Sequence, residues 1–152
     1  MVNKTKTNVK EIKPAVEKAI ENKLNIVLKG KAPKLNPTSK DFIHFEINRD
    51  KKVLTLRITS NEGGGLFSKE WIKVDEILTT LGSIKSPTEP FNSTIFKPLF
   101  SSGSANNVSF LAAILRSKEI ALIAAVPSKM YSHQLSVNFA ENRKKLLALT
   151  AK

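Results

Sequence analysis

Apolar and polar residues alternate strictly in two neighbouring segments, residues 42–48 and 53–59. A period of two residues is typical of a strand that buries one face and exposes the other. The polar stretch between the segments predicts a β-hairpin over about 41–60, with a loop centred on Asp50 and Lys51. On the inward face this register pairs apolar residues throughout: Ile47 with Leu54, Phe45 with Leu56 and Ile43 with Ile58.

Four other segments carry apolar residues at the spacing of an amphipathic helix. They predict helices over 9–24, 68–82, 108–118 and 139–150. The expected caps are Ser68 for the second helix, and Asn138 with Glu141 for the last. In each helix the apolar stripe is expected to face the core.

The remaining apolar segments predict three strands, over 25–29, 119–126 and 130–139. In the last of these strands, four residues are expected to share one face: Tyr131, His133, Leu135 and Val137. Stretches that contain proline and lack periodicity predict a basic loop over 31–40 and an irregular segment over 83–106. The phenylalanines of the second stretch indicate that it packs on the core.

Helical and extended segments are interspersed along the 152 residues, which is the length of one domain. This order predicts a single compact α+β domain whose sheet is mainly antiparallel, contains the hairpin and is packed by about four helices. We expect residues 1–8 to form a flexible basic tail and residues 9–152 to form the domain.

Composition excludes several classes of protein. The chain has no cysteine, so disulfides, zinc–thiolate sites, iron–sulfur clusters and thiol catalysis are excluded. The longest apolar run, 120–126, is far shorter than a membrane span, and the polar N-terminus lacks the apolar core of a signal peptide. We therefore expect a location in the cytoplasm or another intracellular compartment, and no membrane partner.

The strong positive charge changes this picture most. The chain has 25 Lys and Arg against 13 Asp and Glu, a formal net charge of +12. Such an excess favours a polyanionic partner, and we expect a non-enzymatic protein that binds DNA or RNA. Lysine supplies point charges for phosphates, and aromatic residues supply stacking surfaces for bases. The candidate contact residues are Lys29, Lys31, Lys34, Lys40, Phe42, Arg57, Arg143, Lys144 and Lys145.

One outward-facing cluster of the hairpin offers an enzymatic alternative. In the expected register His44 stands opposite Arg57, and Glu46 lies diagonal to it. A histidine, a carboxylate and a cation together provide a general base, a general acid and a phosphate clamp. The alternative is therefore a small metal-independent nuclease with these three residues as catalytic candidates. Polar residues on an ordinary solvated sheet face give the same pattern.

The remaining motifs predict neither a cofactor nor a metal ion. The two histidines, His44 and His133, lie far apart in sequence without a metal-ligand spacing. Residues 101–107 resemble an ordinary Ser/Asn-rich helix cap and lack a phosphate-binding fingerprint. A third hypothesis therefore also stays open, an adaptor or inhibitor that binds an acidic protein surface.

Overall fold

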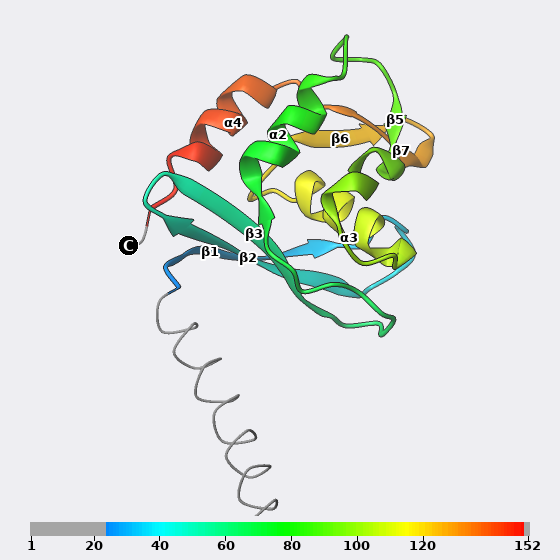
Figure 1. Ribbon diagram of the computed structural model, residues 1–152. Helices are drawn as coiled ribbons and strands as arrows, with labels where there is room; N and C mark the ends of the chain where they lie inside the picture. Colours follow the sequence, from blue (N-terminus) through cyan, green and yellow to red (C-terminus); the bar gives the residue numbers. More distant parts are fainter. Residues whose placement is uncertain (1–23, 151–152) are drawn as a thin grey trace, which may run out of the picture.

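Two antiparallel sheets form the framework of the computed structural model, which describes residues 24–150 (Figure 1). The larger sheet has the strand order β1-β2-β3-β4, with β1 at Ile26–Pro33, β2 at Phe42–Asp50, β3 at Val53–Asn61 and β4 at Ile72–Lys73. The smaller sheet has the order β5-β7-β6, with β5 at Phe91–Asn92, β6 at Ile123–Val126 and β7 at Lys129–Leu135. The expected α+β fold with antiparallel strand pairing is confirmed.

Helices cover one face of the larger sheet (Figure 1). Those that pack on it are α2 at Val74–Gly82 and α3 at Ala105–Arg116, and the 3-10 helix η1 at Ser93–Leu99 packs on both of them. The last helix is α4 at Phe139–Leu147. Helix α3 lies between the two sheets and contacts β1, β2 and β6. Six consecutive residues of this helix, Phe110–Leu115, are buried. Within residues 24–150, no helix combines the length and apolarity needed to cross a membrane.

The inward face of the hairpin is the one that the alternation predicts. Its apolar residues are all buried: Ile43, Phe45, Ile47, Leu54, Leu56 and Ile58. The expected register, however, is wrong by two residues, because Phe45 pairs with Ile58 and Asp50 pairs with Val53. The turn is therefore Lys51 and Lys52, where Lys51 adopts a left-handed conformation with φ 56°. A slip of two residues leaves every side chain on its original face, so hydrophobicity alone does not exclude it.

Strand β1 is longer than predicted and continues through Gly30 to Pro33. A Cβ atom at Gly30 would lie 2.5 Å from Cζ of Phe45, so the aromatic ring occupies the space above this glycine. Gly30 thus lets β1 pass close to the core, where the sequence indicated the end of a strand. The basic loop is shortened accordingly and begins at Lys34.

The starts of two helices also differ from expectation. Helix α2 begins at Val74, because the hydroxyl of Ser68 bonds locally to Glu70 and the chain enters β4 before the helix. Helix α3 begins three residues earlier than predicted and is capped by Ser104, whose hydroxyl accepts from the N–H of Asn106. The segment predicted to be irregular, 83–106, contains β5, η1 and the start of α3.

Three C-terminal elements are shorter than predicted. Strand β6 begins only at Ile123, and β7 ends at Leu135, so the 94% exposed Val137 lies outside the strand. Within β7, His133 is buried while Tyr131 is 57% exposed, so two residues expected to share one face differ in burial. Helix α4 begins at residue 139 as expected but ends at residue 147, and Asn138 makes no side-chain cap.

Two predictions concern residues that the structure does not describe. The tail at 1–8, and all of the helix at 9–24 except Leu24, lie outside the described residues. The domain boundaries that depend on them stay predictions.

A long-range contact anchors the end of α4. The guanidinium of Arg49, on β2, donates from Nε to the carbonyl of Leu149 at 2.6 Å and from Nη2 to the carbonyl of Leu147. These carbonyls lie in the last turn of the helix and just beyond it, where no intrahelical partners exist. A cation at a helix C-terminus also interacts favourably with the helix dipole.

We expect Arg49→Met to lower the free energy of unfolding by about 2 kcal/mol, because charged hydrogen bonds to partly buried carbonyls are lost. The same variant should exchange the amide hydrogens of α4 faster than the wild type. Urea denaturation and hydrogen exchange measure the two effects. The matched control is Lys52→Met in the exposed turn, which should leave both unchanged. An Arg49 variant as stable as this control would show that α4 docks without the contact.

Candidate functional site

The face of the larger sheet opposite α2 and α3 is the candidate surface. Within the described part of the chain, no helix or strand packs on it (Figure 1). Alternation along the strands places the polar half of the hairpin here, because the apolar half faces the helices. We call this surface the open face. Its residues are Lys29 and Lys31 of β1, Phe42, His44, Glu46 and Asn48 of β2, Thr55 and Arg57 of β3, Lys73 of β4, and Trp71 just before β4.

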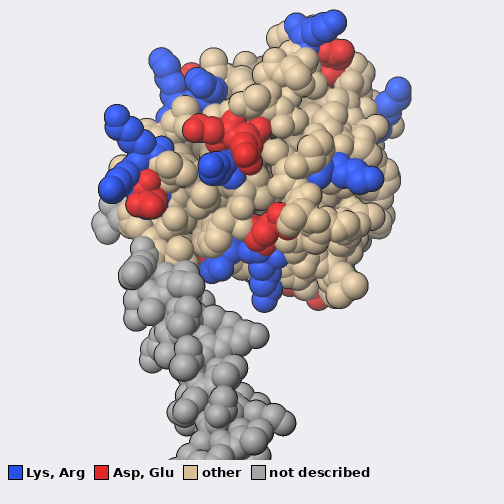
Figure 2. Space-filling view, viewed as in Figure 1, with Lys and Arg blue, Asp and Glu red and all other residues tan. Residues whose placement is uncertain are grey.

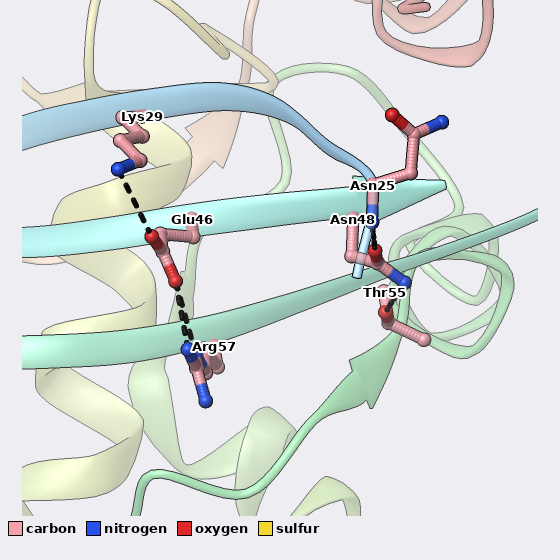
Figure 3. Close-up of polar contacts among 6 residues, drawn as sticks. All are labelled: Asn25, Lys29, Glu46, Asn48, Thr55 and Arg57. Carbon is pink, nitrogen blue, oxygen red and sulfur yellow. Dashed lines mark hydrogen bonds and ion pairs between the residues drawn. The ribbon is translucent and has the colours of Figure 1, made fainter. Parts of the chain in front are cut away.

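A row of interacting side chains crosses the middle of the open face, from β1 to β3 (Figure 3). Glu46 stands opposite Lys29 on one side and Arg57 on the other. Arg57 donates to Oε1 of Glu46 from Nη2 at 2.9 Å and from Nε at 3.1 Å, and Nζ of Lys29 lies 3.8 Å from Oε2. Both oxygens of the carboxylate are thus engaged by cations, and only 15% of its side chain is exposed.

The same row continues to an aromatic residue at the edge of the sheet. The guanidinium carbon of Arg57 lies 4.4 Å from the ring centre of Trp71, so the guanidinium binds Glu46 and also covers the indole. This is a favourable cation–π arrangement. Sequence reasoning missed Trp71, because its spacing to Val74 and Ile77 fits a helix. The sequence gives no clear strand signal here, because the apolar residues Trp71 and Ile72 are adjacent and β4 is only two residues long.

A second cation–aromatic pair lies on β1 and β2. Nζ of Lys31 stands 4.5 Å from the ring centre of Phe42. The ring is partly exposed and the lysine is exposed. The open face therefore carries two aromatic rings, each covered by a cation.

The expected pair of His44 and Arg57 is not formed. A β-bulge between His44 and Phe45 places His44 opposite Ser60, and its ring bonds instead to Glu62 at 2.7 Å. This hydrogen bond lowers the pKa of Glu62 below its ordinary value. The register shift places Glu46, instead of His44, directly opposite Arg57. The three catalytic candidates thus share one face, but the histidine and the arginine bind different carboxylates.

At one end of the open face, amide and hydroxyl groups replace the charges. The N–H of Asn25 donates to Oδ1 of Asn48 at 2.7 Å, and Nδ2 of Asn48 donates to Thr55 (Figure 3). Lys73 stands opposite Thr55 and is exposed. Asn48 is buried, so this end of the surface presents one cation beside the partly exposed Thr55.

The other basic candidates do not join the open face. Lys34 lies on the helix side of the sheet, with Nζ 5.6 Å from the ring centre of Phe110, and Lys40 is exposed in the β1–β2 loop. Arg143, Lys144 and Lys145 are exposed on α4, also on the helix side. Figure 2 shows that, on the face of the molecule seen in this view, basic side chains are spread out with acidic groups between them. The structure thus gathers Lys29, Lys31, Phe42 and Arg57 from the predicted contact residues and separates the rest.

A buried histidine forms a second cluster that sequence reasoning did not find. Nε of Arg116 lies 3.0 Å from Nδ1 of His133, and Nε2 of the ring lies 2.8 Å from the hydroxyl of Ser93. Because a guanidinium only donates, Nδ1 must accept and Nε2 must carry the proton. Burial, together with the charge of Arg116, lowers the pKa of His133 to about 4. The neutral ring donates to Ser93 and cannot act as its base, so this cluster joins β7, α3 and η1 structurally.

In residues 24–150, no group of three or more His, Cys, Asp or Glu side chains is placed to hold a metal ion. No protein-family model matches the chain, and neither curated proteins nor solved structures give a match.

Proposed function

We propose that the protein binds nucleic acid on the open face of the larger sheet, without catalysing a reaction. The observation that carries this proposal is the combination of exposed lysines and partly exposed aromatic rings on one surface that no helix or strand of residues 24–150 covers. Lysines of β1 and β4 contact phosphates, and the rings contact bases or sugars. Phosphate neutralisation supplies most of the affinity of such a surface.

Charge balance supports a polyanionic ligand. The open face has four cations, Lys29, Lys31, Arg57 and Lys73, and one carboxylate, Glu46, with Glu62 at its border. Glu46 is already neutralised by two of these cations. The described residues as a whole contain 18 Lys and Arg against 10 Asp and Glu. A phosphate backbone thus meets a surface of net positive charge on a positively charged protein.

The state of Glu46 favours binding over the nuclease alternative. A general base needs a free carboxylate within reach of the substrate proton. Both oxygens of Glu46 are occupied, and Arg57 is held by the same carboxylate and by Trp71. These groups form a stabilising network on the sheet, and the lysines around them remain available for phosphates.

Matched charge reversals test the proposal. The test pair is Lys31→Glu with Lys73→Glu, both on the open face, and the control pair is Lys85→Glu with Lys97→Glu, both exposed elsewhere. The two double variants have the same net charge. Affinity for fluorescein-labelled DNA and RNA of about 15 nucleotides is measured by anisotropy at two salt concentrations.

We expect the test pair to weaken binding at least about 10-fold and to reduce the salt dependence, because phosphate contacts are lost. The control pair should change affinity by about threefold or less, since salt screens distant charges. Equal losses in both pairs would refute a localised site. A wild type without affinity at moderate salt would favour the acidic-protein partner, and oligonucleotide cleavage that Glu46→Gln abolishes would favour the nuclease.

A further inference from the structure

The two cation–aromatic pairs of the open face indicate which form of nucleic acid it takes. We infer that the open face binds single-stranded nucleic acid, with bases stacked at Phe42 and Trp71 and phosphates on the neighbouring cations. This inference rests on the proposed function and adds the structural class of the ligand. It depends on the placement of the rings, on the shape of the surface and on the groups that hold each ring.

The two rings are spaced to hold different nucleotides. Phe42 lies four residues along β2 from Glu46, which is about 13 Å in an extended strand. Trp71 stands beside Arg57 on the far side of β3, two strands from β2 and about 10 Å across the sheet. One base cannot contact both rings. A ligand that uses both must therefore extend diagonally over the sheet, as a flexible single strand does.

The shape of the open face disfavours a duplex. Four strands spaced by about 4.8 Å form a surface about 14 Å across, whereas the major groove is about 12 Å wide and admits a helix or a two-stranded ribbon. A duplex can thus meet this surface only with its backbone. Its bases are stacked on one another, so their faces are closed to Phe42 and Trp71. Unstacked bases of a single strand present these faces freely.

The cations beside the rings are suited to the same ligand. Lys31 is exposed and carries its charge on a flexible stem, so it can leave the ring of Phe42 for a phosphate while a base takes its place. Arg57 is fixed by Glu46 and holds one face of Trp71. A base can then stack on the face of the indole that the guanidinium leaves uncovered. The ring of Phe42 is thus freed when the ligand binds, whereas the ring of Trp71 is held in position before binding.

The single tryptophan of the chain reports binding directly. The probes are a mixed-sequence DNA of about 15 nucleotides, its RNA equivalent and the DNA duplex of the same sequence. Intrinsic fluorescence and anisotropy are recorded for the wild type, for Phe42→Leu and for Tyr131→Leu. Tyr131 is the matched control, because it is an exposed aromatic on β7, outside the open face.

We expect single strands to bind at least about 10-fold more tightly than the duplex and to quench Trp71. Phe42→Leu should weaken single-strand binding about 10-fold and leave duplex binding unchanged, and Tyr131→Leu should change neither. If Phe42→Leu does not fold, quenching of the wild type by single strands but not by duplex decides the question. Equal affinity for both forms, without quenching, overturns the inference and leaves phosphate binding intact. Absence of all binding overturns the proposed function itself.

Discussion

Replacing Phe45 with Ala is expected to lower the free energy of unfolding by about 3–5 kcal/mol. The side chain is 1% exposed, lies in the centre of β2 and covers Gly30 of the neighbouring strand. Truncation removes the apolar contacts of the ring and leaves a cavity that the sheet backbone cannot close. Equilibrium denaturation in urea at pH 7 measures the loss, with an unchanged m-value showing that the unfolding transition is comparable.

Two further variants control this result. Arg57→Ala, on the open face, should cost only about 1 kcal/mol, because its side chain is partly solvated. Gly30→Ala should itself destabilise the fold, since its Cβ would meet the ring of Phe45, and the added change Phe45→Leu should relieve that clash. A larger loss for Arg57→Ala than for Phe45→Ala would show that the two faces of the sheet have been exchanged.

Acidification is expected to destabilise the protein through His133. The pKa of this histidine is lowered from 6.5 to about 4 in the fold, so the unfolded chain binds a proton first. Stability therefore falls as the pH decreases from about 6.5 to 4, by about 2–3 kcal/mol at pH 4.5. Urea denaturation at a series of pH values records this loss.

The variant His133→Gln separates the effect of His133 on acid stability from the effects of other titratable groups. Glutamine offers an acceptor to Arg116 and a donor to Ser93 but does not titrate, so the loss between pH 6.5 and 4.5 should be largely abolished. His44→Gln, which changes the exposed histidine, should retain the loss. An unchanged pH profile in His133→Gln would assign the acid sensitivity to carboxylates.

Local patterns predicted the faces of the larger sheet but not its register. The period of two around Phe45 allows only one face to be buried, and the structure confirms that face. A hairpin that is slipped by two residues has the same pattern of buried and exposed side chains. The difference in free energy between the two registers therefore arises from the turn. Lys51 adopts the left-handed conformation that closes the observed turn, although lysine is not a residue that signals it.

The features of the structure that escaped prediction depend on contacts between distant segments. Trp71 reads as the start of an amphipathic helix, but Glu70 accepts hydrogen bonds from Ser101, and the chain enters β4 at Ile72 before α2 begins at Val74. The strand character of Lys31 depends on Gly30 fitting beneath Phe45. His133 reads as one face of an alternating strand, and its burial depends on Arg116 of α3. In each case the contact that determines the observed structure joins two residues at least 15 positions apart in the sequence.

The position of α3 between the sheets has a consequence for synthesis of the chain. All four strands of the larger sheet precede residue 74, whereas the helix that covers their apolar face ends at Arg116. As translation proceeds from the N-terminus, the sheet is complete in sequence while its inner face still lacks this cover. Unprotected apolar strands favour aggregation and binding by chaperones. The nascent chain should therefore be most vulnerable until residue 116 has left the ribosome, when α3 becomes available to cover the larger sheet; β6 and β7 of the smaller sheet are made only afterwards.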